Sequence, residues 1–147
     1  MIKVPTKNFA NSSFAIIEIG DSFLLQKRDD IKNIWYPSML GLFGGKIENN
    51  ENEFDALKRE ILEETNIILK KISFLCDFRI KNKKSFFTRY IFFSKIKNLP
   101  NNFHVTEGKG YVLVKKDKLF LLKKTIIPTD YVSLSYYLRL KYNYYLL

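Results

Sequence analysis

The segment over residues 44–67, GGKIENNENEFDALKREILEETNI, restricts how this chain can fold more than any other part of it. Three apolar residues recur there at helical spacing, namely Phe54, Leu57 and Ile61. This spacing predicts a helix over residues 52–65 with one apolar stripe, which must pack against another element. The helix is therefore expected to lie on a face of a sheet built from the strands around it.

The stretches before this segment have patterns typical of strands. Residues 13–19 and 22–27 are predicted to form a β-hairpin, because Gly20 and Asp21 supply a tight two-residue turn. The polar stretch RDDIKNIWYPSM then reads as a loop, and the apolar LGLF before the double glycine as a short strand. The chain therefore enters the helix from a sheet.

The second half of the chain predicts more strands and one further helix. Residues 70–80 and 85–96 are predicted to form a long hairpin around the basic turn KNKK, because the second stretch is aromatic and β-branched. The second half of EGKGYVLVKK predicts another strand, and residues 130–142 a C-terminal helix. This order predicts a mixed sheet with helices on its faces, an α+β or α/β sandwich forming one domain over residues 1–147.

Length and composition exclude several classes of protein. A chain of 147 residues with 46% apolar content has the usual size of one globular domain. The single Cys76 excludes an internal disulfide framework, and it is expected to be a buried structural thiol in a reducing, cytoplasmic setting. No apolar run is long enough to cross a membrane, and the N-terminus has no apolar signal region.

The net charge of +10 has two interpretations. The abundance of Lys, Asn, Ile, Phe and Tyr is typical of an AT-rich coding sequence. A positive field also speeds the arrival of polyanions such as nucleotides or RNA. Charge alone does not choose between these interpretations.

The predicted helix places three carboxylates close together. Glu60, Glu63 and Glu64 fall within about 100 degrees of one another around the helix axis, beside the apolar stripe. Each such like-charge pair costs a few tenths of a kcal/mol on an isolated helix. A hard divalent cation offsets that cost, since Mg²⁺ prefers oxygen ligands and is often held by carboxylates together with substrate phosphates. The other interpretation is a solvated acidic helix face.

The spacing of the segment favours the metal site. Gly45 is followed after five residues by Glu51 and after seven more by Arg59, which begins REILEETNI. This arrangement resembles the box of the Nudix hydrolase family, including its MutT-like members, at every charged position. It departs from the box only at Asn66, where the family has Gly. Because Asn tolerates a positive φ better than other non-glycine residues, the helix is still expected to end there.

The resemblance implies a fold, a chemistry and a set of roles. Nudix proteins have an α/β/α sandwich and cleave a diphosphate linkage in nucleotide derivatives with Mg²⁺ or Mn²⁺. Carried over to this chain, Glu60, Glu63 and Glu64 are the expected metal ligands, with the Gly44 carbonyl as a further one. Arg59 is expected to orient the carboxylates. In some members the counterpart of Glu60 activates the attacking water, and in others a glutamate from a later loop does so.

Further candidates lie outside the helix. Glu107 is the only acid between Asp77 and Asp117 and sits in a glycine-flanked loop, so it is the proposed loop carboxylate, acting as metal ligand or base. The other interpretation is a turn acid in water. The candidates for substrate binding are Arg28, Trp35, Tyr36, Lys46 and Glu51.

Three more residues stay open. Alternation does not decide whether Arg79 and Arg89 face the cleft or the solvent, and His104 reads as a surface residue.

The leading hypothesis is a hydrolase that splits a nucleoside triphosphate or a nucleoside diphosphate derivative by water attack on phosphorus. The alternatives are an RNA 5′-end pyrophosphohydrolase and a nucleotide-sensing module without turnover. The terminal YNYYLL has two interpretations. It contributes to the interface of a homodimer, or it caps the core.

Overall fold

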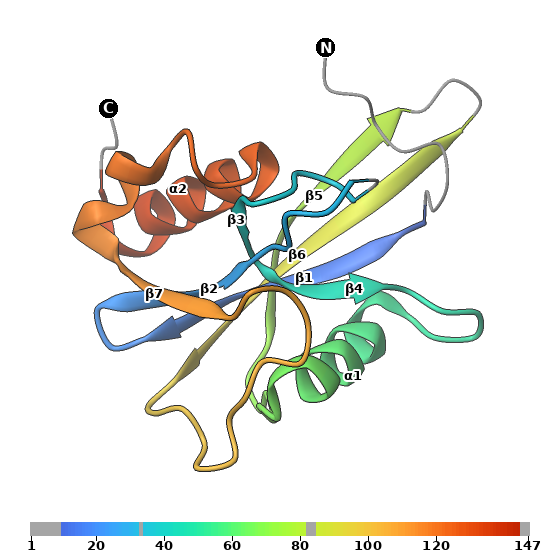
Figure 1. Cartoon of the computed structure of the whole chain (residues 1–147), viewed down its shortest axis with the longest axis horizontal. Coiled ribbons are helices and arrows are strands. Elements are labelled where there is room, and N and C mark those ends of the chain that lie inside the picture. Colours follow the sequence, from blue (N-terminus) through green and yellow to red (C-terminus); the bar gives the residue numbers. More distant parts are fainter. Residues whose placement is uncertain (1–9, 33, 82–84, 145–147) are drawn as a thin grey trace.

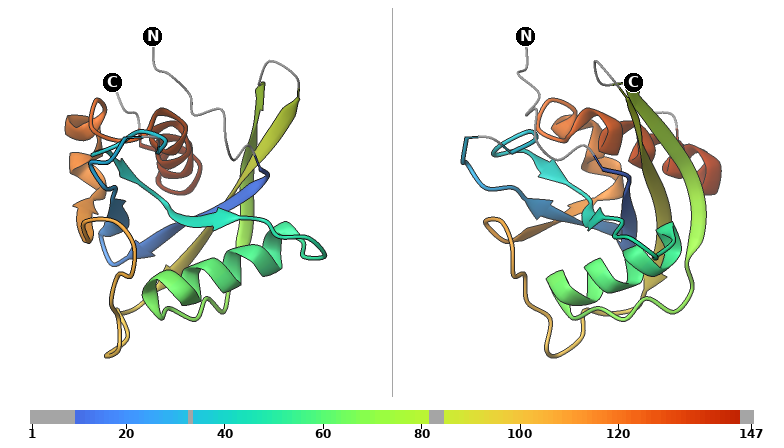
Figure 2. Two further views of the ribbon diagram at one scale, coloured as in Figure 1. Left: turned by 45° about the vertical axis from the view of Figure 1, so that its right-hand side comes forward. Right: turned by 90° about the vertical axis from the view of Figure 1, so that its right-hand side faces the viewer.

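The computed structural model describes residues 10–32, 34–81 and 85–144. The strands are β1 (Ser12–Ile19), β2 (Ser22–Lys27), β3 (Leu40–Gly41), β4 (Phe43–Lys46), β5 (Ser73–Lys81), β6 (Phe86–Ile96) and β7 (Tyr111–Lys115). The helices are α1 (Glu53–Thr65), the 3₁₀ helix η1 (Lys116–Leu122) and α2 (Pro128–Tyr142). Within these described residues the strands form one mixed sheet, and α1 and α2 cover its opposite faces (Figure 1, Figure 2).

Strand β1 is the centre of this sheet. β6 pairs with it in parallel along its whole length, from Ser12 opposite Arg89 to Ile19 opposite Ile96. On its other side, β1 pairs antiparallel with β4 in its first half and with β2 in its second half. β5 lies beyond β6 at one edge, and β2 also pairs with β3 and β7. The expected mixed sheet between helices is confirmed.

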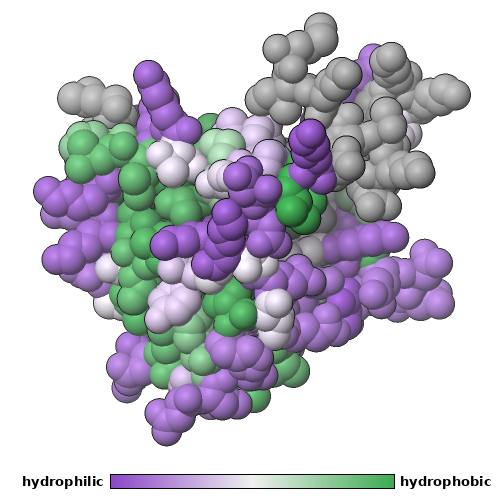
Figure 3. Space-filling view, in the orientation of Figure 1, coloured by the Kyte–Doolittle hydropathy of each residue, from purple (hydrophilic) through white to green (hydrophobic). Residues whose placement is uncertain are grey.

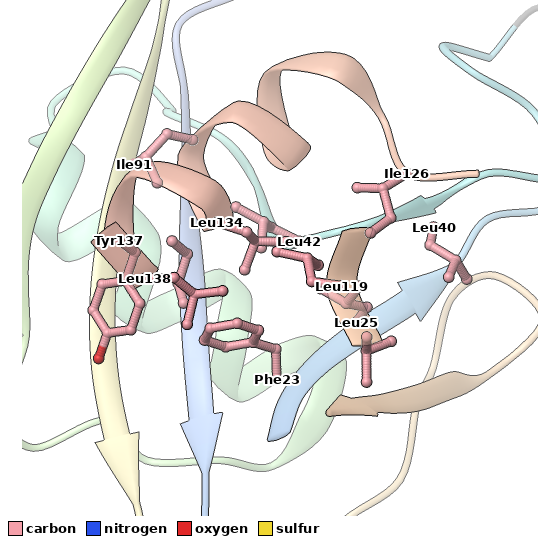
Figure 4. Packing of buried hydrophobic residues seen from close by; sticks show 12 residues of the cluster. Phe23, Leu25, Leu40, Leu42, Ile91, Leu119, Ile126, Leu134, Tyr137 and Leu138 are labelled. Carbon is pink, nitrogen blue, oxygen red and sulfur yellow. The ribbon is translucent and has the colours of Figure 1, made fainter. Parts of the chain in front are cut away.

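Alternation along β1 divides the core into two parts. Ile16 faces α2, whereas Ala15 and Ile17 face α1. The core on the α2 side includes Phe23, Leu25, Ile91, Leu134, Tyr137 and Leu138, as Figure 4 shows. The core on the α1 side includes Leu24, Phe43, Leu57, Ile61 and Phe92. Because both faces of the sheet are covered, its central strands read as nearly continuous apolar runs.

Most of the expected elements are confirmed, and some boundaries move. β5 begins at Ser73 rather than at residue 70, and α2 begins at Pro128, whose missing N–H is tolerated at the first helical position. The single short strand expected before the double glycine is two strands. The backbone N–H of Leu42, between β3 and β4, donates to the Asp130 carboxylate (2.9 Å) instead of to a neighbouring strand. The helix η1 was not predicted, and residues 82–84 of the predicted basic turn lie outside the described residues.

The expectation for Cys76 was wrong in degree. The side chain is half-buried, with its sulfur 4.0 Å from the Ser133 hydroxyl of α2. The reason is the position of β5 at the sheet edge, where α2 covers only one side of the strand. Cys76 still lines the core on the α2 side.

A buried carboxylate ties the C-terminus to the sheet. Glu18 of β1 has no exposed surface and accepts hydrogen bonds from the hydroxyls of Tyr137 (3.1 Å) and Tyr142 (2.7 Å). The ammonium groups of Lys95 and Lys116 each lie 3.2 Å from it. Tyr142, the first residue of the C-terminal aromatic segment, therefore ties the end of α2 to β1.

The surface also carries apolar side chains. Figure 3 shows hydrophobic residues gathered on the left of the molecule, where β7 and η1 lie. The exposed large hydrophobic residues of these elements are Tyr111, Leu113, Phe120 and Leu121. Among the described residues, no helix combines the length and the hydropathy needed to cross a membrane.

Candidate active site

Helix α1 has well-defined ends, and these ends fix the positions of its carboxylates. The Asn52 side chain accepts a hydrogen bond from the Asp55 backbone N–H (2.8 Å) at the N-terminus. At the C-terminus, Asn66 has φ 62° and ψ 13°, and its N–H donates to the Leu62 carbonyl. This left-handed cap confirms that Asn can end the helix where the family box has Gly.

The two glycines of β4 are needed for different reasons. Gly44 has φ +147°, and a Cβ there would overlap the Ser13 carbonyl of β1. Gly45 lies under the helix instead, and a Cβ there would stand 2.5 Å from the carboxyl carbon of Glu60. Gly44 therefore serves the β1–β4 contact, whereas Gly45 leaves room for a carboxylate.

Arg59 organises the acidic side chains around it. Its guanidinium donates to both carboxylate oxygens of Glu51 (2.6 and 3.0 Å), to Glu60 (2.9 Å) and to Glu63 (3.3 Å). It also donates to the Lys46 backbone carbonyl (3.0 Å). The hydrogen bond from Arg59 lowers the pKa of Glu51 to about 2, while the Glu51 hydrogen bond raises the pKa of Arg59. The expected orienting role of Arg59 agrees with this geometry.

Glu64 is the most unusual of these acids, because it is 4% exposed and one of its carboxylate oxygens, Oε2, has no hydrogen-bond partner among the described residues. Burial, followed by the charges of Glu60 and Glu107, raises the pKa of Glu64 to about 9. A backbone hydrogen bond from Gly44 acts in the opposite direction. A buried, unpaired carboxylate is costly unless a cation occupies the space beside it.

The loop between β6 and β7 brings Glu107 to this place, running beside the C-terminal end of α1 (Figure 1). The Thr106 N–H donates to the Glu64 carbonyl (3.1 Å). The Gln26 side chain donates to the Glu107 carbonyl (3.2 Å). Because the charge of Glu107 reaches Glu64, the structure brings together the loop carboxylate and the helix carboxylates that the sequence predicted separately.

Asn66 adds a second tether to this loop. Its side-chain amide donates to the Asn102 carbonyl (2.9 Å) and lies 2.7 Å from Nδ1 of the exposed His104. A glycine at this position provides the same backbone conformation but none of these contacts. The departure from the family box therefore joins the end of α1 to the loop that carries Glu107.

The carboxylate set fits a divalent cation. Glu60 and Glu107 both lie within electrostatic reach of Glu64, and oxygen ligands of this kind suit Mg²⁺ or Mn²⁺. Over residues 10–32, 34–81 and 85–144, no three Asp, Glu, His or Cys side chains already enclose a cation site. Glu60 is turned toward Arg59, and Glu63 is exposed and also contacts Arg59. The unpartnered oxygen of Glu64 is the feature that fits an ion.

The predicted aromatic contacts lie on the loop between β2 and β3. The Arg28 side chain donates through Nε to the Trp35 carbonyl (2.7 Å). The Trp35 ring meets Phe87 edge-to-face at 5.7 Å and Tyr36 at 6.0 Å. Burial, followed by the charge of Arg89, lowers the pKa of Arg28.

Sequence reasoning missed an ion pair beside this loop. Arg89 donates to the buried Asp130 at 2.7 Å, and its guanidinium lies 3.5 Å from the centre of the Phe14 ring. Arg79 is exposed, so the two arginines left open by the sequence separate clearly. The charges of Asp130 and Glu64 both reach Arg28, so this arginine is within electrostatic reach of the ion pair and of the carboxylate cluster. The sequence signal for this ion pair was Asp130, an acid in the first turn of the predicted C-terminal helix.

The two remaining substrate candidates act elsewhere in this geometry. Glu51 is bound by Arg59 and by the Glu48 backbone N–H, and the contact found for Lys46 is made by its carbonyl. Both therefore hold Arg59 in place.

Comparison with known proteins gives the same assignment as this geometry. The family model described as NUDIX domain matches residues 10–133, which include the box, Glu107 and Asp130. The chain belongs to the Nudix family. As a Nudix hydrolase, it is an enzyme that hydrolyses phosphoric anhydrides.

Individual relatives of this Nudix protein match different shares of the chain. It is 27% identical over 131 residues to YtkD of Bacillus subtilis, assigned as an 8-oxo-dGTP diphosphatase, covering 83% of this chain and 78% of that protein. It is 52% identical over 44 residues to an 8-oxo-dGTP diphosphatase of Buchnera aphidicola, covering 29% of this chain and 31% of that protein. The MutT crystal structure from Methanosarcina mazei has the same fold, with a TM-score of 0.75, 18% identity and coverage of 92% and 98%.

Proposed function

We propose that this chain is a divalent-metal-dependent pyrophosphohydrolase of nucleoside triphosphates, with 8-oxo-dGTP as the first substrate to test. The buried, unpartnered carboxylate oxygen of Glu64 carries this proposal, because it lies beside two further acids in a chain with net charge +10. The choice among nucleotides rests on the names of the two relatives reported above. Nucleotide sugars and related diphosphate derivatives are the second substrate class.

The proposed metal ligands are Glu60, Glu64 and Glu107, with Glu63 and the Gly44 carbonyl as further ligands. Glu64 has an oxygen without a partner, and Glu60 and Glu107 are near enough to add charge to it. When bound, Mg²⁺ or Mn²⁺ neutralises the polyphosphate and lowers the pKa of a coordinated water. Arg59 keeps the Glu60 carboxylate oriented and prevents it from turning freely in solvent.

In the proposed reaction, the oxygen of a water molecule attacks phosphorus and one phosphoanhydride bond breaks. The water proton passes to a carboxylate, and the leaving phosphate oxygen departs with the electron pair of the broken bond. The products are a nucleoside monophosphate and pyrophosphate. Glu60 and Glu107 are the two candidates for the proton acceptor.

The substrate is proposed to lie along the Arg28 side of the carboxylate cluster. Arg28 lies within electrostatic reach of Glu64 and of the Arg89–Asp130 ion pair. Its guanidinium can therefore contact a phosphate, while Trp35 and Tyr36 offer aromatic surface to a base.

The proposal is tested with a panel of substrates and one matched pair of variants. The panel comprises 8-oxo-dGTP, unmodified nucleoside triphosphates, nucleotide sugars and a 5′-triphosphate RNA, each with Mg²⁺ or with a chelator. Glu64→Gln is expected to abolish turnover, whereas Asp55→Asn, an exposed acid on the same helix, is expected to retain it.

The products and the salt dependence separate the alternatives. Release of pyrophosphate from a triphosphate supports the proposal. Turnover of RNA that is steeply reduced by salt supports the RNA alternative. Binding without any cleavage supports a sensing module.

A further inference from the structure

A cavity of about 630 Å³ lies behind the loop that carries Glu107. It is lined by residues of two segments, 66–71 after α1 and 95–102 at the end of β6 and the start of the loop. Its lining includes none of the acids assigned above to the metal site. The cavity is therefore a separate feature of the molecule.

The charge of this cavity is one-sided. Its lining contains Lys70, Lys71, Lys95 and Lys97 but no Asp or Glu. Across the described parts of the chain, Lys70, Lys71 and Lys97 make no ion pair. Lys95 contacts the buried Glu18 at 3.2 Å, yet its side chain is 66% exposed. An anionic group placed beside these ammonium groups is attracted by their positive charge.

Part of the cavity lining is apolar. Ile68, Ile96 and Pro100 belong to it, and Ile68 is 70% exposed. An inorganic anion leaves such a surface in water, whereas a ligand with a planar or apolar body covers it. The volume lies in the range of small-molecule sites, about 300–1,000 Å³.

We infer that this cavity, which we call the lysine cavity, binds a phosphorylated small molecule of nucleotide size. The phosphates contact the lysines of the lining, and the base or another flat body lies on Ile68, Ile96 and Pro100. Side-chain amides of Asn66, Asn98 and Asn102 line the same cavity and offer polar contacts between the two parts. The inference goes beyond the proposed hydrolase and does not depend on it.

Binding is tested with ADP in the presence of a chelator, so that the metal site does not hold the phosphates. The double variant Lys71→Gln/Lys97→Gln removes two charges from the lysine cavity. The matched control, Lys123→Gln/Lys124→Gln, removes two exposed charges outside its lining. The dissociation constant is expected to rise about tenfold in the first variant and by less than about twofold in the second.

The location is read from amide chemical shifts in the ¹⁵N-labelled wild-type protein. Shifts on addition of ADP are expected over residues 66–71 and 95–102. Shifts confined to the surroundings of Arg28 and Glu64 overturn the inference, as does an equal loss of affinity in both double variants.

Two further ligands test the class of molecule. Inorganic triphosphate has the charge but no flat body, so it is expected to bind at least about tenfold more weakly than ADP. Equal binding of the two contradicts the role of the apolar residues in the lining. Binding of a single-stranded RNA ten-mer, with none of ADP, overturns the small-molecule inference in favour of a polynucleotide surface.

Discussion

The substitution Gly45→Ala provides the sharpest test of how the strand β4 serves the site. The new Cβ would stand 2.5–2.8 Å from three atoms of the Glu60 carboxyl group. Ordinary contact begins at 3.4 Å, so the carboxyl group must move by at least about 0.9 Å. Since it is the far end of a flexible side chain, this movement is expected to lower the free energy of unfolding by less than about 1 kcal/mol.

The same movement is expected to be costly for catalysis. It displaces the Glu60 carboxylate relative to Arg59 and the neighbouring acids. A 1 Å misplacement of a reacting group can lower the rate about 10²-fold. We therefore expect kcat/KM for the preferred nucleotide to fall about 10²-fold while the urea midpoint stays nearly constant. The measurement pairs a pyrophosphate-release assay with urea unfolding followed by circular dichroism.

Gly44→Ala is the matched control for this argument. Gly44 has φ +147°, and a Cβ there would overlap backbone atoms of Ser13 and Phe14. Backbone atoms cannot move aside as the end of a flexible side chain can. We expect a loss of more than about 3 kcal/mol in the free energy of unfolding. Full activity of Gly45→Ala, or wild-type stability of Gly44→Ala, refutes the assignment of one glycine to the site and the other to the sheet.

Three further substitutions test the tether, the buried site acid and the C-terminal cap. Asn66→Gly keeps the left-handed cap but removes the amide contacts to the loop. The Mg²⁺ concentration for half-maximal activity is therefore expected to rise about tenfold, with little change in Tm. The control, Asn143→Gly at the cap of α2, is expected to leave that Mg²⁺ concentration unchanged. Glu64→Gln is expected to raise the free energy of unfolding of the metal-free protein at pH 7 by about 1–3 kcal/mol. With its pKa raised to about 9, the Glu64 carboxyl must take up a proton when the wild type folds, whereas Gln is neutral in both states, and lower stability of the variant in urea contradicts this. Burial raises the pKa of Glu18, but hydrogen bonds from Tyr142 and its other partners have a larger combined effect in the opposite direction. The net pKa is therefore below 4.5. The advantage of the wild type over Glu18→Gln in urea unfolding is therefore expected above pH 4.5 and lost as the pH falls through the lowered folded-state pKa.

The comparison of sequence with structure separates local from non-local information. The hairpin around Gly20 and the bounds of α1 follow from residues within one or two turns of each other, so the sequence predicted them well. The break of the short strand at Leu42 was missed, because its cause is Asp130, 88 residues away. The half-burial of Cys76 depends in the same way on which strand lies at the edge of the sheet.

The chemistry of α1 follows from its local sequence. Helical periodicity places the carboxylates on one face, and the fixed spacing of Gly45, Glu51 and Arg59 from them is a property of the chain. The surroundings of that face depend instead on contacts between distant parts of the chain. The loop contact at Thr106 brings Glu107 to Glu64, and the parallel register of β1 with β6 turns Arg89 inward to Asp130, which is 41 residues further along the chain. Such contacts depend on strand order and register, which no local spacing encodes.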